Sequence, residues 1–188
     1  MAALRDSAGA LIVGAGTLRA EDPPPFVHEQ KRPGKGRRGP FAWVILTRSL
    51  EVPAASRVLR SDEIEKIIVA PEGAGTEAQE RALRAVAEVW RIGRGGVDLA
   101  ALLGRLRERG IRRVVVEGGG EVNFSFLEAG LVDEVFVTLC PYLLGGAGAP
   151  TLADGAGFSN ASAPRLVLLG LERAAGEVFL HYRCERRA

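Results

Sequence analysis

The sequence contains little of what marks several common classes of protein. Among 188 residues there are only two cysteines, two histidines and one methionine, and the cysteines and histidines do not occur at metal-ligand spacing. No apolar run reaches the roughly 20 residues that a membrane-spanning helix needs. The formal net charge is only +2, which provides no general attraction for nucleic acid. We therefore expect a cytoplasmic protein with no metal, no membrane segment and no nucleic-acid partner.

The composition is otherwise ordinary for a globular protein. Apolar residues make up 47% of the chain and charged residues 26%, and the length is sufficient for a sizeable core. We expect a single domain over residues 1–188. Cys140 and Cys184 lie far apart, each in an apolar, strand-like segment, so two buried thiols are expected and a disulfide is the alternative.

Strand and helix patterns alternate along the chain, which is typical of an α/β fold with a mostly parallel sheet. Eight segments are expected to be strands: 10–13, 43–47, 66–70, 88–92, 113–117, 134–139, 165–171 and 177–184. Three segments have helical spacing of their apolar residues: 76–87, 97–109 with Asp98 as its N-cap, and 121–129. The last two strands, separated by residues 172–176, are expected to form an antiparallel hairpin at the end of the sheet.

Two loops have unusual compositions. Residues 31–39 contain five basic residues and three glycines, which is typical of a solvated excursion between strands. A grip on a substrate phosphate is an alternative role, whereas nucleic-acid binding is disfavoured because no aromatic residues are interleaved. Residues 143–152 form a long glycine-rich loop, and such loops usually cover a site or an interface.

The stretch over residues 114–123 has the clearest pattern for function. Three valines of a buried strand are followed by Glu117 and then by Gly118–Gly120. A strand that ends on glycine and opens a helix exposes backbone N–H groups at the helix N-terminus, where a phosphate is favoured. Glu117 would lie at the carboxyl end of the strand, where open α/β sheets bind ligands. We expect a nucleotide-phosphate cradle with an acid beside it; the alternative is a tight turn that binds nothing.

Residues 12–19 also contain glycines and partly match a dinucleotide-binding fingerprint. Arg19 stands where the third glycine of that motif belongs, and no acidic residue ends a second strand at the required distance. A Rossmann fold is therefore not indicated. The glycines still permit close approach to the backbone, and Thr17 can donate its hydroxyl to a phosphate or an amide.

Several blocks of the sequence together resemble the pyrimidine reductases of riboflavin biosynthesis, whose fold is that of dihydrofolate reductase. The blocks are residues 10–17 continuing to 22–23, residues 44–49, residues 116–120, and residues 131–135 leading to Pro141 and Gly145-Gly146. They occur in the family's order over essentially the whole chain. Residues 145–158 are most similar to the single-domain reductases that act on the 2,5-diamino pyrimidine. The resemblance implies a mostly parallel mixed sheet flanked by helices, with the antiparallel hairpin at its end.

The resemblance also implies an activity and a set of site residues. The family reduces the ribosyl group of a ribosylamino-pyrimidine 5′-phosphate to ribityl, with NADPH as hydride donor. Four residues would contact NADPH outside the glycine-rich stretch: Thr17, Glu21, Thr47 and Arg48. A continuous stretch would hold its pyrophosphate: Gly118, Gly119, Gly120, Glu121, Val122, Asn123, Phe124 and Ser125. The substrate contacts would be Arg5, Pro25, His28 and Glu117. Family members pair as homodimers, and the apolar residues 135–144 could form that interface.

Glu117 is the expected catalytic residue. The anomeric carbon of the sugar must accept a hydride while the ring oxygen accepts a proton, so a carboxyl group near that oxygen is useful. Glu117 would either orient the ribose or relay the proton, and the cofactor would perform the hydride transfer. The alternative is a carboxylate at the strand end that only stabilises the N-terminus of the following helix. The residues do not distinguish a diamino substrate from its deaminated counterpart, since the two differ by one exocyclic group.

Three residues depart from the family pattern in the implied site. Glu21 replaces the usual aspartate, which moves the carboxylate by one methylene. Pro25 and His28 stand where leucine and arginine are common. Neutral histidine cannot reproduce the bidentate phosphate grip of arginine, and the basic residues of 31–38 are a possible replacement.

The beginning of the chain departs further. In the family a first strand, which lies inside the sheet beside the cofactor, precedes the segment with which this sequence starts, and residues 1–5 resemble the middle of the helix after that strand. We expect a domain that is shortened at its N-terminus, with unpaired backbone beside the missing strand unless another segment fills the gap. A non-catalytic, dimeric nucleotide-binding domain therefore stays open as an alternative to the reductase. A dihydrofolate reductase proper is a weaker alternative.

Overall fold

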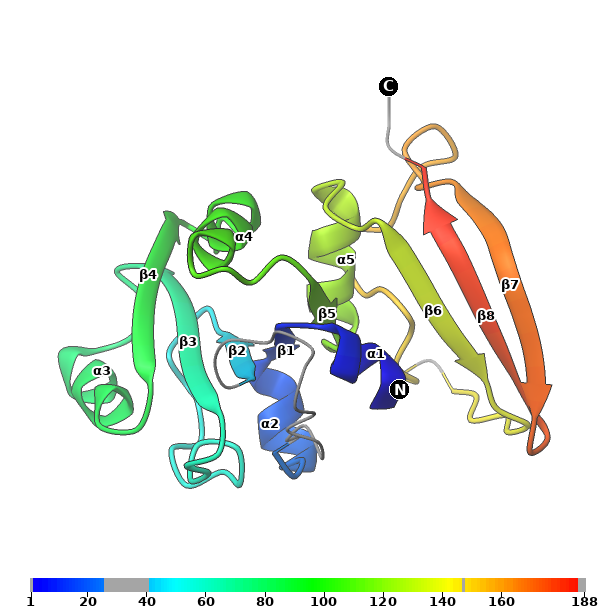
Figure 1. The fold of residues 1–188 in the computed structure, drawn as a ribbon. Helices are drawn as coiled ribbons and strands as arrows, with labels where there is room; N and C mark the ends of the chain where they lie inside the picture. Colours follow the sequence, from blue (N-terminus) through cyan, green and yellow to red (C-terminus); the bar gives the residue numbers. More distant parts are fainter. Residues whose placement is uncertain (1, 26–40, 147, 186–188) are drawn as a thin grey trace.

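The structure, a computed structural model, describes residues 2–25, 41–146 and 148–185. These residues form a five-stranded parallel sheet with helices on both faces and a separate three-stranded antiparallel sheet (Figure 1). The expected α/β fold class, with a parallel sheet and a C-terminal hairpin, is confirmed. The expected single mixed sheet is instead divided in two.

The parallel sheet has the order β4-β3-β2-β1-β5. Its strands are β1 (Ala10–Gly14), β2 (Ala42–Leu46), β3 (Glu65–Glu72), β4 (Glu88–Arg94) and β5 (Val114–Val116). The chain moves outward from β1 to β4 and then crosses back to place β5 on the other side of β1. The strand order therefore reverses between β1 and β5.

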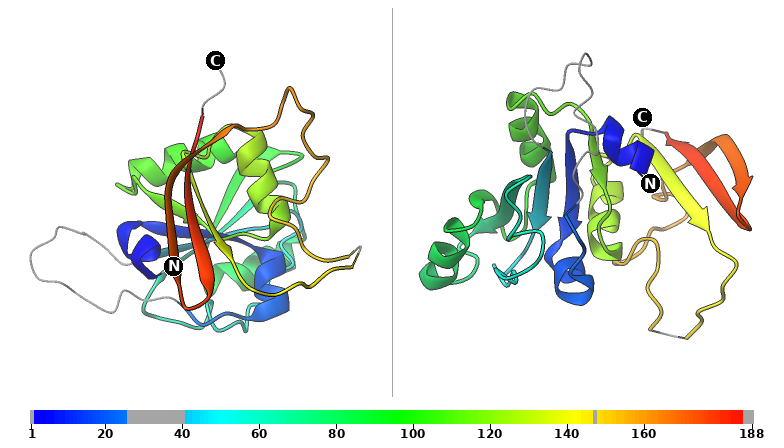
Figure 2. Two further views of the ribbon diagram at one scale, coloured as in Figure 1. Left: turned by 90° about the vertical axis from the view of Figure 1, so that its right-hand side faces the viewer. Right: turned by 60° about the horizontal axis from the view of Figure 1, so that its bottom comes forward.

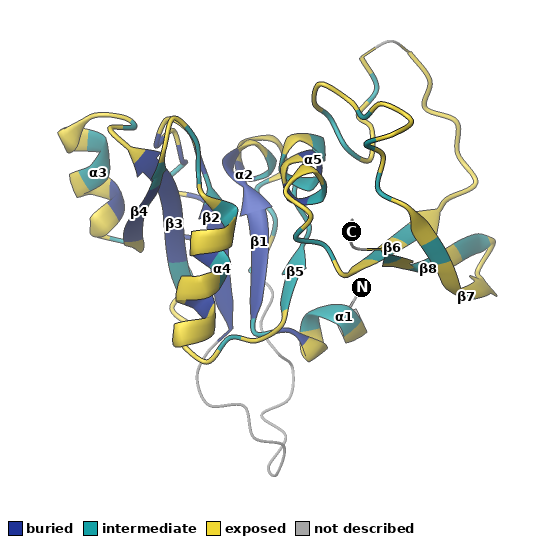
Figure 3. Ribbon diagram, turned by 90° about the horizontal axis from the view of Figure 1, so that it is seen from above, coloured by how far each residue is buried: buried dark blue, intermediate teal, exposed yellow. Residues whose placement is uncertain are grey.

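Helices cover both faces of this sheet, which explains why its central strands are apolar throughout rather than alternating. The helices are α1 (Ala2–Ser7), α2 (Ala15–Glu21), α3 (Glu77–Arg84), α4 (Leu99–Glu108) and α5 (Gly120–Glu128). Leu18 of α2 and Leu83 of α3 belong to one hydrophobic cluster, while Leu102 of α4 and Phe126 of α5 belong to the other. In Figure 3 strands β1 and β2 are the most deeply buried, whereas β5 is of intermediate burial throughout.

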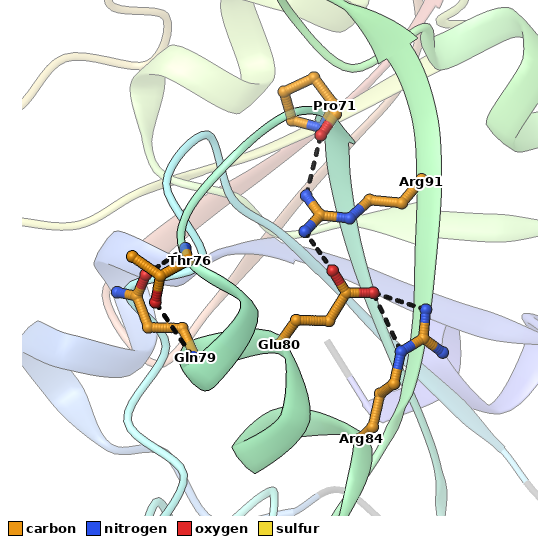
Figure 4. A network of polar contacts seen from close by, with 6 residues as sticks. All are labelled: Pro71, Thr76, Gln79, Glu80, Arg84 and Arg91. Atoms are coloured by element: carbon orange, nitrogen blue, oxygen red, sulfur yellow. Dashed lines mark hydrogen bonds and ion pairs between the residues drawn. The ribbon is translucent and has the colours of Figure 1, made fainter.

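Local interactions fix the helices at their ends. The side chain of Asp98 accepts a hydrogen bond from the Ala101 N–H, which confirms it as the N-cap of α4. Thr76 and Gln79 form a reciprocal capping box at the start of α3. Glu80 of α3 then accepts hydrogen bonds from both Arg84 and Arg91, and so joins α3 to β4 (Figure 4).

The antiparallel sheet consists of β6 (Glu134–Leu139), β7 (Leu166–Ala174) and β8 (Glu177–Cys184), in the order β6-β8-β7. Its hairpin is tighter than expected. Ala175 and Gly176 alone join β7 to β8, with φ of 50° and 82°, whereas a connection of five residues was predicted. Two left-handed residues match the twist of the flanking strands, so the pairing continues to the turn.

The two sheets do not share a ladder in the described part of the chain. There β5 pairs only with β1, and β6 pairs only with β8. One edge of β5 and one edge of β6 therefore have no strand beside them among the described residues.

Two further expectations require correction. The helix α2 was not predicted, because its start is a glycine without a side-chain cap. The thiols are not both buried: Cys140 is exposed and Cys184 is half-buried, and neither forms a disulfide within the described residues. Cys140 lies beyond the end of β6 at the rim of an uncovered sheet, where its hydrogen bond to Glu177 raises the pKa of the thiol. Within the described residues, none of the helices is long and apolar enough to cross a membrane.

Candidate active site

The candidate site lies at the carboxyl ends of β1 and β5, where the strand order reverses. The chain leaves β1 into α2 on one face of the sheet and leaves β5 into α5 on the other face. Connections that diverge in this way leave a crevice between them, and open α/β sheets bind their ligands there. The Glu117 N–H donates to the Ile12 carbonyl at 3.0 Å, so the end of β5 is held against β1.

The three consecutive glycines have different structural roles. A Cβ on Gly118 would lie 2.5 Å from Val122 Cβ. A Cβ on Gly120 would collide with the Asp154 carboxylate and lie 2.8 Å from the Asp154 backbone nitrogen. Packing within the protein thus requires two of the glycines. Only Gly119 faces open space, with Thr17 Oγ1 at 3.8 Å as the nearest atom.

The glycines after β1 divide in the same way. A Cβ on Gly14 would lie 3.1 Å from Val122 Cγ2, whereas Gly16 is exposed and has only the Arg19 guanidinium within 4 Å. Gly16, Thr17 and Gly119 therefore bound a stretch of bare backbone at the crevice. This is the geometry that allows a ligand to approach the main chain.

The remaining residues expected at the cofactor lie along the same edge of the sheet. Thr17 and Glu21 are four residues apart on α2 and so lie on the same side of that helix. Thr47 follows β2, is buried, and accepts a hydrogen bond from the Ser49 N–H. Arg48 reaches from the end of β2 to α5, where it pairs with Glu121 at 2.8 Å between two exposed side chains.

Most of α5 beyond its first turn faces the protein. Phe124 is buried and its ring packs against Phe158 with centroids 4.7 Å apart. The Asn123 side chain donates to the Leu152 carbonyl at 2.9 Å, and the Ser125 hydroxyl donates to the carbonyl of Glu121. Asn123 and Phe124 hold α5 and the loop over residues 151–158 together, a role that the sequence did not reveal, whereas the Ser125 bond lies within α5.

Glu117 and Arg5, both expected at the substrate, are brought together by the fold. Glu117 is the first residue after β5, and its side chain is 14% exposed. Arg5 Nε donates to Glu117 Oε1 at 2.8 Å, and Arg5 Nη2 donates to Oε2. This bond to Glu117 raises the pKa of the Arg5 guanidinium, which therefore stays a cation.

The structure describes only one of the other two expected substrate contacts. Pro25 is half-buried at the end of the segment that follows α2. His28 and the basic loop of 31–38 lie outside the described residues. Two hollows in the described surface, one bounded by Asp133 and Arg183 and the other by Leu50 and Leu83, are not lined by Thr17, Glu117 or Gly119. The site is therefore located by strand topology and bare backbone rather than by a closed pocket.

The fold and the site together define a class of protein. A doubly wound parallel sheet with bare backbone and an acid at the point where the strand order reverses is typical of enzymes that bind a nucleotide cofactor beside a small substrate. Comparison with known proteins narrows this class. The chain belongs to the RibD C-terminal domain family, whose sequence profile matches residues 1–180.

Curated members of the same family align with this chain over most of their length. A 2,5-diamino-6-ribosylamino-4(3H)-pyrimidinone 5′-phosphate reductase of Methanothermobacter thermautotrophicus is 40% identical over 167 residues, which are 88% of this chain and 74% of the relative. The protein of the same name from Archaeoglobus fulgidus is 35% identical over 159 residues, or 82% of this chain and 72% of the relative. The resemblance found in the sequence, to the riboflavin-biosynthesis reductases of this kind, is thereby confirmed.

Solved structures agree with the fold. The structure of a pyrimidine reductase-like protein from Corynebacterium diphtheriae superimposes with a TM-score of 0.85 at 26% identity, covering 99% of this chain and 79% of the other. The riboflavin biosynthesis reductase Rib7 of Saccharomyces cerevisiae, at 19% identity, supports the fold alone, with a TM-score of 0.68 and coverage of 98% and 78%. The chain is thus similar to oxidoreductases of riboflavin biosynthesis in both sequence and structure.

Proposed function

We propose that this protein reduces the ribosyl group of a ribosylamino-pyrimidine 5′-phosphate to a ribityl group, with NADPH as the hydride donor. The observation that carries the proposal is the bare backbone at Gly119, which faces Thr17 at the reversal of strand order. We place the activity in one reductase domain that spans residues 1–188. Relatives that are 35–40% identical are named for the 2,5-diamino form of the substrate, so we propose that form.

The cofactor site is proposed along the carboxyl edge of the parallel sheet. The N–H groups at the start of α5, whose N-cap is Gly119, would receive the pyrophosphate at Gly118–Glu121. Thr17 and Glu21 would bind from α2, and Thr47 and Arg48 from the end of β2. The fit is supported by the open face of Gly119, since a side chain there would occupy the space that the pyrophosphate needs.

The later residues of the proposed cradle contribute from behind it. Val122 packs against the positions of Gly14 and Gly118, and Asn123 and Phe124 hold the loop of 151–158 against α5. The Ser125 hydroxyl donates a hydrogen bond to the Glu121 carbonyl, one turn earlier in the helix. A cradle whose supporting side chains are fixed in this way keeps its N–H groups aimed at the ligand without reorganisation.

The substrate is proposed to lie on the β5 side of the crevice, next to Glu117 and Arg5. A bound NADPH would supply the hydride that the anomeric carbon accepts; the bond from that carbon to the ring oxygen would break, and the oxygen would take a proton. Glu117, which is largely shielded from water, is proposed to bind a ribose hydroxyl or to assist that proton transfer. Pro25 and His28 are proposed to complete the substrate side.

We further propose that the protein acts as a homodimer in the cytoplasm, where its phosphorylated substrate and NADPH are found. Tyr142, Leu143 and Leu144 are consecutive and largely exposed, and they continue the uncovered side chains of Phe136 and Leu139 on β6. An apolar surface of this kind, extending over residues 136–144, is typical of a protein interface.

A second candidate function is cofactor binding without turnover. The division of the sheet between β5 and β6 favours it, because Glu117 directly follows β5, which lacks a neighbour on one side in the described residues. Catalysis needs a site held to within a fraction of an ångström, whereas binding tolerates more freedom. Turnover of the 2,5-diamino substrate by the purified protein would eliminate this alternative.

Thermal unfolding with and without cofactor tests the proposed site. Saturating NADPH, at about 100 times its dissociation constant, is expected to stabilise the native state by about 2.7 kcal/mol and to raise the Tm more than NADH does. Gly119 has φ of −59° and ψ of 169°, which any residue adopts, so Gly119→Val should fold and yet lose the shift. The matched control is Gly96→Val, which also faces open space and should retain it. An equal NADPH shift in the Gly119 variant and the wild type would refute the cradle.

A further inference from the structure

The ion pair between Arg5 and Glu117 occupies both oxygens of the carboxylate that the proposed function places next to the substrate. Two parallel N–H···O bonds join the planar guanidinium to the planar carboxylate. A fork of this kind fixes the plane of the carboxylate as well as its position. The pair is partly shielded, with 30% of the Arg5 side chain and 14% of the Glu117 side chain exposed.

The backbone at both ends of this pair is held in place. Arg5 lies on α1, which Figure 1 shows beside β5, and the Arg5 carbonyl accepts a hydrogen bond from the Ala8 N–H. The Gly9 N–H donates to the Arg113 carbonyl at 2.7 Å, which ties the end of α1 to the start of β5. Glu117 is tied to β1 through Ile12. The guanidinium therefore reaches Glu117 from a fixed helix.

The pairing also limits the chemistry of Glu117. A carboxylate that accepts two bonds from a guanidinium acts as an acceptor and has no proton to give. Each of its oxygens still has a second lone pair, with which it can accept a bond from a hydroxyl group. Removal of Arg5 would free the carboxylate to rotate and would leave its charge without a partner in a shielded position.

We propose that Arg5 is a positioning residue: it holds Glu117 in one orientation as a hydrogen-bond acceptor, so that Glu117 orients a ribose hydroxyl and does not supply the proton of the reaction. This inference rests on the proposed reductase activity. It assigns the proton of the ring oxygen to solvent or to another group. In the alternative role, Arg5 would bind the substrate directly and independently of Glu117.

A double-mutant cycle tests the proposal. The wild type, Arg5→Gln, Glu117→Gln and the double variant are compared by kcat and KM for the 2,5-diamino substrate and by the Kd for NADPH. If Arg5 acts through Glu117, each single variant loses kcat by about 10²-fold, as a small misplacement of a reacting group does, and the double variant loses no more than Glu117→Gln alone. The Kd for NADPH stays within about twofold in all four, because neither residue lies at the proposed cradle.

Two results would contradict the positioning role of Arg5. Losses that multiply in the double variant, or a rise in KM for Arg5→Gln with kcat unchanged, would show that Arg5 binds the substrate independently and would overturn the proposal. Arg5→Lys keeps the charge but not the fork, so it should recover only part of kcat. If Arg5→Gln does not fold, Arg5→Lys replaces it in the cycle and the same comparison applies.

Two controls distinguish a failure of the positioning role from a failure of the proposed reductase activity. Arg165→Gln breaks an exposed ion pair with Glu185 far along the chain and should leave kcat unchanged. A wild-type protein that binds NADPH but turns over neither the 2,5-diamino nor the deaminated substrate would refute the proposed function, and the positioning role with it. Wild-type turnover combined with independent effects would refute the positioning role alone.

Discussion

The parallel sheet and the C-terminal antiparallel sheet are stabilised in different ways. The parallel sheet lies between two hydrophobic clusters, and Ile67 and Ile68 on its opposite faces are fully buried. The described residues within 134–184 contribute no side chain to either cluster, and Leu139, Leu168 and Leu171 on the antiparallel strands are 61%, 51% and 58% exposed. Because apolar burial is the main stabilising term in folding, the first region stabilises itself and the second depends on its attachments.

The attachment is concentrated on α5. The loop over residues 151–158 contacts that helix through Asn123, Gly120 and the paired rings of Phe124 and Phe158. The same helix supplies the N-terminus that we propose for the cofactor. The difference between the two regions therefore indicates that the candidate site belongs to the self-stabilised part of the molecule, and that α5 carries contacts between this part and the weaker one.

Truncation of matched apolar side chains should have its largest effect in the parallel sheet. Ile68→Ala removes a fully buried side chain and is expected to lower the free energy of unfolding by about 2–5 kcal/mol. Leu168→Ala on β7 removes a half-exposed one and should cost less than about 0.5 kcal/mol. Urea denaturation of the two variants measures both values. Comparable losses would mean that the C-terminal sheet is buried in solution.

A side chain at Gly155 should loosen the contact between the two regions. A Cβ there would lie 2.6 Å from Phe124 Cε1, so Gly155→Ala should displace the loop and cost about 1–3 kcal/mol. Gly148→Ala, in the same long connection but facing open space, is the control. Hydrogen exchange should become faster in residues 151–158 of the first variant only. Unchanged protection in both variants would show that the loop is held by other contacts.

The proposed dimer predicts a change in mass rather than in fold. Leu143 is fully exposed, so Leu143→Asp leaves the fold intact, but it places a charge in the proposed interface. We expect the weight-average mass in analytical ultracentrifugation to fall from about twice that of one chain towards that of one chain, and the dimer to weaken by about 1–3 kcal/mol. Arg57→Asp, on the parallel-sheet region, is the control. A wild-type protein that sediments as one chain would contradict the interface.

A small effect is expected at the ion pairs that join α3 to β4. Hydrogen bonds from Arg91 and Arg84 lower the pKa of Glu80 (Figure 4). The stabilisation from Glu80 is therefore complete above the pKa of an unfolded glutamate and is lost as the pH falls through the lowered folded value. Glu80→Gln should remove this part of the acid dependence and cost less than about 1 kcal/mol at pH 7. If the free energies of unfolding of wild type and Glu80→Gln change in parallel from pH 7 to pH 3, Glu80 does not contribute to the acid dependence.

The sequence predicted the elements of both regions better than their assembly. The bounds 134–139 and 177–184 of two strands were predicted correctly, because alternating and β-branched residues there end at clear turn residues. The helix α2 was missed, since Gly14, Ala15 and Gly16 resemble a turn and the helix is only seven residues long. Contacts with distant parts of the chain decide whether such a short segment forms a helix or a turn. A local sequence pattern carries no information on those contacts.

The same limit applies to the site. The glycines at 118–120 predicted a cradle as one unit, but only the positions of Val122 and Asp154 show that two of them are required by packing. The pair of Arg5 and Glu117 joins residues 112 positions apart, so no spacing in the sequence indicates it. The residue types alone indicated the acid and the exposed glycine backbone. The residues that contact them could be identified only from the folded structure.

The pairing of β1 with β5 has a consequence for the order in which the molecule folds. The β7–β8 hairpin closes over two residues, whereas the ladder that pairs Ile12 with Val116 must bring together the two ends of most of the parallel region. Contacts between distant positions form slowly, because the entropy of closing the loop must be lost before they contribute. We therefore expect the weaker sheet to form early and the crevice beside Glu117 to be assembled late, so that competence for ligand binding marks the last step of folding.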